Sequence, residues 1–414
     1  MLKNFLPGRA VVERLRAGLF GPHLDSFVAG LCELGYTSST VRARLRLLDH
    51  LGRWLGRQSL GLADLQEQLV NRFLEERRHK GRLKKGDARA ARHFLEYLRE
   101  TDAVPSPELV ADESPLATLR RQYENHLEKE RGLAAVTITS YWRFIRRLLI
   151  ERFGDAPLRV QELTPDDVSN YLLRHARSGS PKVARLMVTA LRSFFRFLFL
   201  HGQTESDLAG AVPTVPEWRL AELPKYLASE EVERVVRACE RDGSVARRDR
   251  AIILLLARLG LRASEVIDLE IDDVDWRAGE LKVRGKGGHH DCLPLPVDVG
   301  AAMASYLRHH RPPCTTRRLF VRTKAPYRGF ANPSSISTIV RRAMNRAGLH
   351  PDFKGAHVLR HSLATGMLRS GASLNEIGEV LRHRSPSTTE IYAKVDVQGL
   401  RSLALPWPTK GGQQ

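Results

Sequence analysis

One segment near the C-terminal end restricts the fold more than any other, because it places polar, reactive side chains inside otherwise apolar helical patterns. It runs from Gly355 to Val395 and contains His357, Arg360, His383 and Tyr392. His357 and Arg360 are three residues apart, so on a helix both side chains project from one face. Any fold of this chain must pack these helices and still leave the polar groups free to meet a ligand.

Two capping patterns divide this segment into shorter helices. Residues 373–376 (SLNE) and 387–390 (STTE) both fit S-x-x-E, in which the two outer side chains satisfy backbone groups at a helix start. Each pattern predicts a new helix, with His383 near the turn between them and Tyr392 inside the second helix. A guanidinium offers paired donors to phosphate, and an imidazole moves protons near neutral pH. Together the side chains suggest a phosphate held for attack by a phenol.

The charge of the chain indicates a polyanionic partner. Its 414 residues carry a formal net charge of +19. Lys and Arg exceed Asp and Glu by 6 in residues 1–110, by 3 in 111–220 and by 10 in 221–414. Nucleic acid is the usual partner for such an excess. An anionic membrane surface is the alternative, but it favours one concentrated basic helix. The spread of charge therefore favours a long footprint on double-stranded DNA.

Cysteine spacing and apolar runs bear on the compartment. The four cysteines are far apart and form no C-x-x-C pair, which predicts reduced thiols without a disulfide framework or zinc site; they are Cys32, Cys239, Cys292 and Cys314. The N-terminus lacks the apolar core of a signal peptide, and the apolar run Ala251–Ala257 is too short to span a bilayer. We therefore expect a cytoplasmic protein with no membrane partner.

The first half of the chain reads as two copies of one helical layout. Residues 23–100 and 115–200 share the order of a capped helix, an acidic turn and a final aromatic helix. Thr40 precedes Thr137 by 97 residues, Val70 precedes Val168 by 98, and Tyr97 precedes Phe197 by 100. A slowly drifting offset is what loop insertions between matching helices produce, although any two helical bundles give some matches. This pattern favours duplication.

Two proline-rich breaks separate the modules and mark a change of pattern. Residues 102–115 (DAVPSPELVADESP) read as a linker, and the prolines in residues 209–228 rule out a continuous helix. Beyond them, helical patterns at 229–241, 248–259, 298–310 and 334–347 surround three short apolar runs in residues 273–296, which predict a small antiparallel sheet. Asp272, Asp273 and Asp275 could suggest magnesium, but they read better as a helix end entering a strand.

Two further candidates lie in this C-terminal part. Arg262 follows Gly260, which can close the preceding helix, and stands before a helix carrying Glu265. Its guanidinium can reach into a cleft while Glu265 holds it, although a surface ion pair is the commoner role of an arginine. Lys286 sits among glycines in RGKGG at the tip of the predicted hairpin. A turn lysine is by default solvated, but one on a flexible finger also suits protonation of a leaving alkoxide.

Five motifs together resemble the tyrosine recombinase (phage integrase) family. They occur in the family's order and approximate spacing: GLRASE, RGKGG, HVLRHSLAT, LRH and STTEIY. The resemblance covers residues 221–400 strongly and implies a tyrosine recombinase catalytic domain there. It implies a core-binding (SAM-like) helical DNA-binding domain at 111–215. Residues 1–110 look like a diverged core-binding-like copy, which departs from the common two-domain layout, and 401–414 form a C-terminal tail. The expected fold is mainly α with a small antiparallel β-sheet in the C-terminal domain.

The resemblance also implies a reaction and assigns its residues. Tyr392 would attack a DNA phosphodiester and form a 3′-phosphotyrosine link. The implied catalytic set is Arg262, Lys286, His357, Arg360, His383 and Tyr392, supported by Glu265 and His361. The arginines would neutralise the phosphate oxygens, His357 would act as base, His383 would donate a hydrogen bond, and Lys286 would protonate the leaving 5′ oxygen. No Walker sequence or two-metal carboxylate cluster is present, so no cofactor or metal is expected.

Two departures and two alternatives accompany this interpretation. Arg382 and Arg384 flank His383 where the family often has a glycine and a small polar residue, and Pro386 enters the loop before the tyrosine. The added charge would strengthen backbone contacts or alter loop motion. We expect a homotetramer on DNA, with sister recombinases as possible partners, that integrates, excises or transposes a mobile element. The alternatives are a type IB topoisomerase and a non-catalytic accessory protein, and the tail after Tyr392 would dock on its own domain or on a neighbouring protomer.

Overall fold

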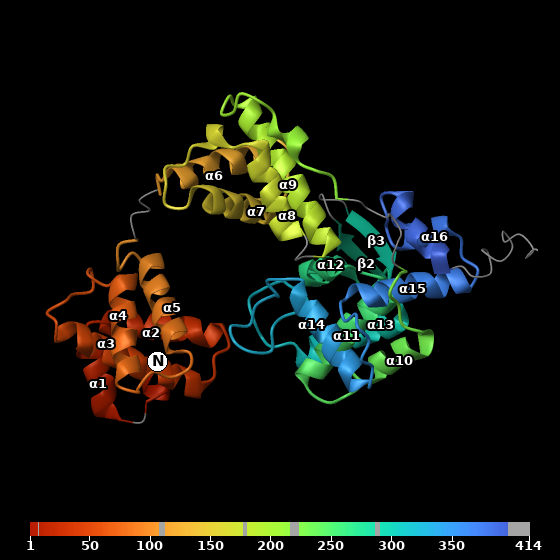
Figure 1. Cartoon of the computed structure of the whole chain (residues 1–414). Helices are drawn as coiled ribbons and strands as arrows, with labels where there is room; N and C mark the ends of the chain where they lie inside the picture. The colour runs from red at the N-terminus through yellow and green to blue at the C-terminus, as the bar shows by residue number, and fades with distance from the viewer. Residues whose placement is uncertain (7, 107–111, 177–179, 216–222, 286–289, 396–414) are drawn as a thin grey trace, which may run out of the picture. The chain divides into compact units, whose positions relative to one another are not determined.

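The computed structural model describes residues 1–6, 8–106, 112–176, 180–215, 223–285 and 290–395. Most of the described chain is helical, and one three-stranded sheet lies in its C-terminal part (Figure 1). Contacts divide the chain into two compact units, one of residues 1–107 with 222–414 and the other of residues 108–221. The predicted fold class, mainly α with a small antiparallel sheet, is confirmed.

The first 106 residues build a helical bundle around their own apolar core. Its helices are α1 (Arg9–Ala17), α2 (Gly21–Glu33), α3 (Ser38–Gly56), α4 (Glu67–His79) and α5 (Asp87–Glu100). Thr37 caps α3 by accepting a hydrogen bond from the Thr40 N–H, as the run of hydroxyl residues predicts. The apolar stripe of α3, including Val41, Leu45 and Leu48, is fully buried.

Residues 112–215 build a second bundle with a separate core. Its helices are α6 (Pro115–Asn125), α7 (Ala135–Phe153), α8 (Pro165–Ala176) and α9 (Pro181–Leu200). A π-helical turn at His126–Glu130 extends α6. α3 and α7 are both 19 residues long, and their first residues are 97 positions apart in the sequence.

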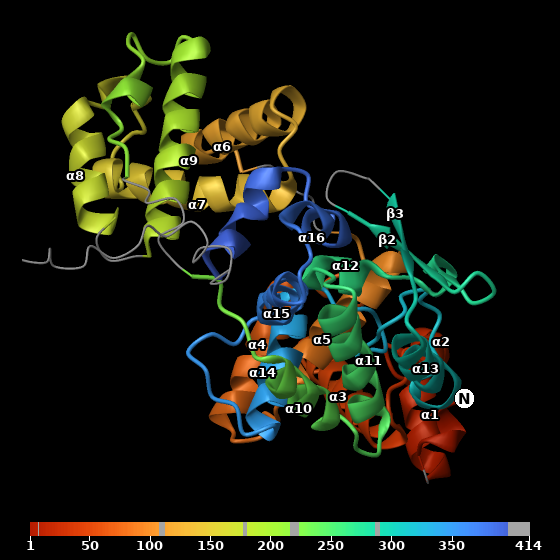
Figure 2. The ribbon, with the colours of Figure 1, turned by 90° about the vertical axis from the view of Figure 1, so that its right-hand side faces the viewer.

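The C-terminal part consists of helices with a small sheet at their edge, and a third apolar core joins them. Its helices are α10 (Ser229–Arg237), α11 (Ser244–Arg258), α12 (Ala263–Asp268), α13 (Val297–Ser305), α14 (Ser334–Arg346), α15 (His357–Arg369) and α16 (Leu374–Val380). Strands β1 (Val274–Asp275), β2 (Glu280–Arg284) and β3 (His290–Pro294) pair antiparallel in the order β1-β2-β3. β2 packs against α12, and α15 lies against α11 and α16 (Figures 1 and 2).

The end of the described chain differs from its prediction. Ser373 and Glu376 form the expected capping box at the start of α16. The second pattern does not open an α-helix: residues Pro386–Thr388 and Glu390–Val395 form two short 3₁₀ turns. Proline restricts the backbone and lacks an N–H, which suits the first turn of a short, tight segment better than a long α-helix. Tyr392 therefore lies on a 3₁₀ turn.

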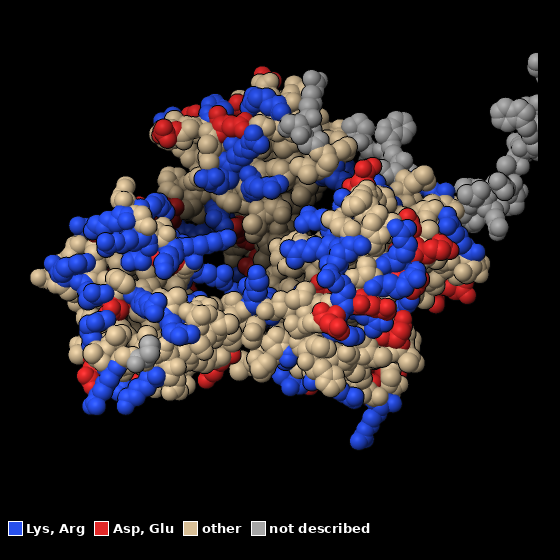
Figure 3. All heavy atoms as spheres, turned by 90° about the horizontal axis from the view of Figure 1, so that it is seen from below, with Lys and Arg blue, Asp and Glu red and all other residues tan. Residues whose placement is uncertain are grey.

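Further observations concern the cysteines, the apolar content of the helices and the surface charge. All four cysteines are free thiols. Among the described residues, no helix has the length and apolar content needed to cross a membrane. Lys and Arg side chains cover much of the face shown in Figure 3, and Asp and Glu form smaller groups between them.

Candidate active site

A helix junction positions the first arginine. α11 ends at Arg258, Gly260 adopts φ +58°, and α12 begins directly after Arg262. The Arg262 N–H donates to Oε2 of Glu265 at 2.8 Å, and its Nη1 donates to Oε1 of the same carboxylate at 2.7 Å. Glu265 is only 4% exposed. Burial raises the pKa of Glu265, but the Arg262 N–H and the charges of Arg382 and Arg262 outweigh it and lower that pKa overall. The carboxylate thus holds Arg262 in one direction.

The second arginine is held by backbone carbonyls. Arg360 lies in the first turn of α15 and is 4% exposed. Its Nη1 donates to the carbonyl of Gly260, and its Nη2 donates to the carbonyl of Leu381. Burial, with the nearby charges of Arg262 and Arg382, lowers the pKa of Arg360 to about 10. The guanidinium therefore stays cationic at neutral pH, and among the described residues no carboxylate forms an ion pair with it.

His383 follows α16 and is electrically neutral at physiological pH. Desolvation and the positive charges of Arg360 and Arg262 lower the pKa of His383 to about 4. Its Nδ1 lies 2.7 Å from the hydroxyl of Thr389, a residue with 2% exposure. If Thr389 donates this bond, the proton of the neutral ring sits on Nε2. That N–H is then available as a hydrogen-bond donor to a ligand.

Tyr392 is buried against a histidine that the sequence predicts only as a supporting residue. Its ring is 1% exposed and packs with Ile377 and Leu381. Its hydroxyl lies 2.9 Å from Nδ1 of His361. Burial raises the pKa of Tyr392 to about 12, although the charge of Arg360 opposes the rise. The phenol is therefore buried and protonated, and its hydroxyl is hydrogen-bonded to His361.

His357 lies at the start of α15, one turn before His361. Its side chain is exposed, yet partial desolvation by surrounding protein and the charges of Arg360 and Arg262 lower its pKa. The rings of His357 and His361 are 6.2 Å apart. His357 is consequently neutral near pH 7, which is the state a proton acceptor needs.

Arg262 lies at the edge of a pocket that is lined mostly by polar and charged residues. A cavity of about 970 Å³ is lined by Arg262, Glu265, Arg382, His383 and Arg384, together with residues of β2, β3 and α12. Arg360, His357 and Tyr392 do not line it. The charges of Arg360 and Arg262 nevertheless act on both His357 and His383, so the residues form one electrostatic site.

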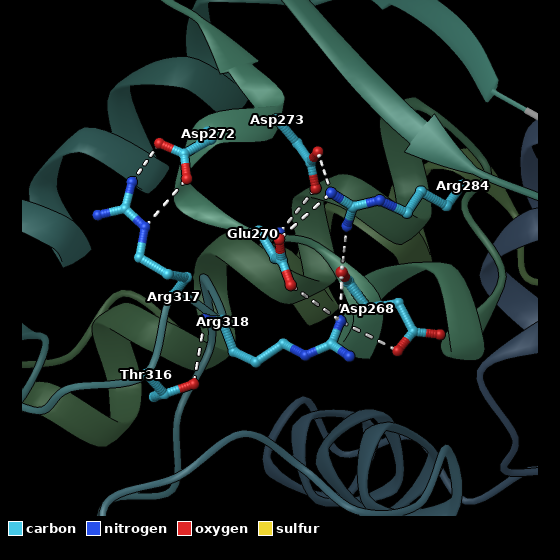
Figure 4. Close-up of polar contacts among 8 residues, drawn as sticks. All are labelled: Asp268, Glu270, Asp272, Asp273, Arg284, Thr316, Arg317 and Arg318. Atoms are coloured by element: carbon cyan, nitrogen blue, oxygen red, sulfur yellow. Dashed lines mark hydrogen bonds and ion pairs between the residues drawn. The ribbon is translucent and has the colours of Figure 1, made fainter.

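The hairpin that carries Lys286 is anchored at its base. Lys286 lies outside the described residues. At the end of β2, Arg284 donates to Asp273 at 2.8 Å, to Glu270 at 3.3 Å and to the carbonyl of Asp268 at 3.0 Å (Figure 4). Asp273 is 5% exposed, so this contact fixes β2 against the segment after α12. The hairpin therefore starts from a fixed base next to Arg262.

The acidic run of this segment pairs with arginines. Asp272 and Asp273 belong to a 3₁₀ turn, Ile271–Asp273, that enters β1, as the sequence predicts. Asp272 accepts from Arg317, while Asp273 accepts from Arg284 (Figure 4). Arginine side chains are thus the partners of both carboxylates.

One group of described side chains has the composition of a metal site, and it lies in the second helical bundle. The ligand atoms of His126, Glu130 and His201 are all within 4.8 Å of one another. Glu130 and His201 are exposed, and Nδ1 of His126 already lies 2.8 Å from Glu130. None of the three belongs to the pocket described above.

Several features of the site have no sequence signal of their own. The carbonyls of Gly260 and Leu381 hold Arg360. Every residue has a backbone carbonyl, so the sequence does not show which one accepts a hydrogen bond. The contact between Tyr392 and His361 joins residues 31 positions apart. Arg382 was expected on DNA contacts or in loop motion, but its side chain is 7% exposed and pairs with Glu265 at 2.8 Å. Arg382 stands where the family often has a glycine, and this difference is the one sequence signal that could have marked it as a residue of the site.

Two fixed guanidiniums, neutral imidazoles and a buried phenol are groups that suit phosphoryl transfer. Comparison with known families matches residues 225–398 to "Phage integrase family" and residues 121–202 to "Phage integrase, N-terminal SAM-like domain". The chain belongs to the phage integrase family of tyrosine recombinases, enzymes that cleave and rejoin DNA.

Relatives of known name agree with this assignment. The chain is 41% identical to the putative integrase/recombinase y4rA of Sinorhizobium fredii over 98% of its own length and 99% of that protein. It is 34% identical to the tyrosine recombinase XerD of Mycobacterium tuberculosis over 70% of its length and 96% of that protein. Nearly the whole chain, including residues 1–110, therefore has a counterpart in y4rA. The type IB topoisomerase and the accessory protein are not favoured.

Solved structures share the fold. The XerH site-specific recombinase bound to a palindromic difH substrate matches with a TM-score of 0.56 and 23% identity, covering 75% of this chain and 93% of that one. A lambda integrase tetramer bound to a Holliday junction matches with a TM-score of 0.51 and 19% identity, covering 75% and 87%.

Proposed function

We propose that this recombinase cuts DNA with Tyr392 as its nucleophile. The phenolic oxygen bonds to the phosphorus, the bond from phosphorus to the 5′ oxygen breaks, and the leaving oxygen takes a proton from Lys286. The 3′-phosphotyrosine bond conserves the energy of the broken linkage, so a 5′-hydroxyl from another strand can reverse the step. Strand exchange follows without a nucleotide or metal cofactor.

The single observation that carries this proposal is the placement of Arg360. Its guanidinium is buried, cationic and held by two carbonyls, and no carboxylate in the described part of the chain is bound to it. Burying an uncancelled charge is costly unless it serves an anionic ligand. Arg262 and Arg360 neutralise the non-bridging phosphate oxygens, which gain charge in the transition state. The Nε2–H of His383 donates a further hydrogen bond to them.

Proton removal from Tyr392 needs help from the site. With a pKa of about 12, ionising the phenol at pH 7 costs about 7 kcal/mol, against about 4 kcal/mol for a free phenol. In our proposal the Tyr392 hydroxyl leaves His361 when DNA binds and moves toward Arg360 and His357. The guanidinium then stabilises the phenolate, and neutral His357 accepts the proton.

Covalent capture tests this function. Nicked duplexes of randomised sequence are incubated with the protein, and DNA that remains attached through SDS is amplified, so the protein itself selects its substrate from the pool. We expect an adduct with a free 5′-hydroxyl and Tyr392 as the modified residue, and none with Tyr392→Phe. Tyr226→Phe removes a hydroxyl that instead binds Arg369 and should keep the adduct. Binding without adduct formation by the unaltered chain would contradict the proposal.

The helical modules at 1–110 and 111–215 are proposed to clamp the DNA duplex, the first as a diverged copy of the second. The matching lengths and offset of α3 and α7 support duplication. α8 starts 98 residues after α4, and the ends of α5 and α9 are 100 residues apart, as insertions between copies require. A clamp with many phosphate contacts explains the spread of positive charge.

The loop between α4 and α5 offers a direct test of the first module. It carries exposed basic residues: Lys80, Arg82, Lys84 and Lys85. Replacing Lys84 and Lys85 by Glu should shorten the protected DNA footprint and reduce the salt dependence of binding by about one to two phosphate contacts. Replacing Lys3 and Arg9 by Glu is the control, because it changes the charge of the same module by the same amount outside this loop. If the Lys84 and Lys85 variant has the footprint of the unaltered chain, the module contacts protein instead of DNA.

The assembly is proposed to be a homotetramer across two DNA duplexes, working alone or with sister recombinases in the cytoplasm on a mobile element. The structure of a lambda integrase tetramer bound to a Holliday junction, a protein of the same fold, supports an assembly of four subunits. Native mass spectrometry on a captured site should give four chains per paired duplex. The tail after Val395, which lies outside the described residues, is proposed to dock between protomers.

A further inference from the structure

Arg382 occupies a backbone position that a glycine would fill more easily. It follows α16 with φ +56°, in the left-handed region. This conformation costs an L-residue other than glycine roughly 1–2 kcal/mol. Its side chain is 7% exposed, so a charged group is also desolvated there. A large cation kept in a strained and buried place indicates that the side chain has a use.

The contacts of Arg382 converge on the pair of Arg262 and Glu265. Its Nη2 donates to Oε2 of Glu265 at 2.8 Å, the oxygen that also accepts the Arg262 N–H. Its carbonyl accepts from Nη2 of Arg262 at 3.5 Å. Its Nε lies 3.7 Å from Asp291 of β3 and makes no hydrogen bond. The residue thus touches Arg262 with its backbone and the partner of Arg262 with its side chain.

Charge counting shows what this contact changes. A carboxylate bound by one guanidinium forms a neutral pair, which offers little net attraction to a phosphate. With Arg382 present, two guanidiniums share the single buried carboxylate of Glu265. Asp291 lies 3.7 Å from Nε of Arg382 but is 42% exposed, so solvent screens this contact and it offsets only part of the added positive charge. Arg382 and Glu265 are largely shielded from solvent, whereas Arg262 is 33% exposed on the pocket side, so the added charge acts on the pocket chiefly through the buried pair.

We propose that Arg382 is a positioning residue that binds Glu265 in competition with Arg262 and ties the His383 turn to α12. Arg262 is thereby aimed at the scissile phosphate with its charge uncancelled. The inference rests on the proposed cleavage reaction. Arg382 acts through Arg262 and the turn, and does not itself contact DNA.

The test compares DNA binding with cleavage on the captured nicked duplex. Arg382→Gly relieves the backbone conformation and removes the ion pair, and Arg382→Met keeps the aliphatic stem while removing the charge. Both should bind the duplex within ~2-fold of the unaltered chain with the same salt slope, and form the adduct ~10-fold more slowly in a single turnover. Arg382→Lys should recover part of the rate.

Coupling to Glu265 separates positioning from a general structural role. In a Glu265→Gln background the partner charge is gone, so adding Arg382→Gly should change the cleavage rate by less than ~2-fold. Arg384→Ala serves as the comparison for a phosphate contact: it should weaken binding and lower the salt slope by about one contact. Melting temperatures establish that each variant is folded.

Three results would overturn the inference. Unchanged cleavage by both Arg382→Gly and Arg382→Met is the first. The second is a lowered salt slope like that of Arg384→Ala, which would make Arg382 a direct phosphate ligand. The third is that Arg382→Gly lowers the cleavage rate by the same factor in the Glu265→Gln background as in the unaltered chain. Failure of the proposed function looks different, because the unaltered chain would then bind the duplex and form no adduct, which removes the basis of the inference as well.

Discussion

The two halves of the active site are built on different principles. The arginine half is fixed: Arg360 is tied to two carbonyls, and Arg262 is tied to Glu265 within one helix start. The phenol half is stored: Tyr392 lies on a short 3₁₀ turn, buried and bonded to His361. Under the proposed function, the contrast means that the arginines are placed before DNA binds, whereas Tyr392 must still move toward them.

The largest expected effect tests the fixed half. Arg360→Lys keeps the charge but cannot bond both carbonyls and face a phosphate at once, because an ammonium lacks the planar fork. We expect single-turnover cleavage to fall ~10²–10³-fold. Arg369→Lys is the control, since Arg369 bonds the Tyr226 hydroxyl near the surface. Equal rates for the two variants would mean that the cradle does not depend on its carbonyl anchors.

A backbone change should disturb the same half less. At Gly260 a Cβ would come 2.7 Å from Leu381 and 3.1 Å from Leu363, and φ is +58°. Gly260→Ala should therefore lower stability by about 2 kcal/mol and slow cleavage ~10-fold by shifting the carbonyl that holds Arg360. Gly279→Ala shares the positive φ but meets nothing within 4 Å. Chemical denaturation of the two variants separates crowding from backbone strain.

Acid should weaken the fold through His383. Its pKa of about 4 in the folded chain lies below about 6.5 in the unfolded chain, so between these values only the unfolded state takes up the proton. Stability is unaffected by this group above pH 6.5 and falls as the pH drops from 6.5 toward 4, by about 1–2 kcal/mol after allowance for solvent screening. His383→Gln should remove that part of the slope in denaturation curves measured across this range.

The smallest effect on rate is expected in the stored half. His361→Phe removes the acceptor of the Tyr392 hydroxyl and leaves a buried polar group unsatisfied, which favours its departure toward the phosphate. Cleavage should stay within ~3-fold of the unaltered rate or rise, while His357→Ala should lower it ~10²-fold. A large loss with His361→Phe and little with His357→Ala would instead make His361 the base, and the comparison of halves would then need revision.

Local patterns predict most of the fold because their causes are local. The Thr37 cap, the apolar stripe of α3 and the capping box at Ser373 each depend on neighbours within one or two helical turns. The second capping pattern fails since Pro386 and the tight turn leave too little regular helix for a cap to serve. Helical periodicity likewise predicts residues 298–310 as one helix, without the π-helical turn at Tyr306–His310.

The sequence predicts which residue types make up the candidate site, but it does not predict the contacts between them. Arginine, histidine and tyrosine identities follow from the chemistry of phosphate transfer, and the fold brings their charges together. The contact between Tyr392 and His361 depends on how α15 and the final turns pack, which no spacing rule encodes. The burial of Arg382 runs against the usual exposure of arginine, so composition alone points the other way.

The carbonyl anchors of Arg360 have an evolutionary consequence. A main-chain oxygen is present whatever side chain the residue carries, so substitutions at Leu381 that keep the turn would preserve the placement of the guanidinium. Related proteins can then diverge widely around an unchanged arginine without losing its orientation. The backbone conformation around this arginine would then be retained even where the neighbouring residues have been substituted.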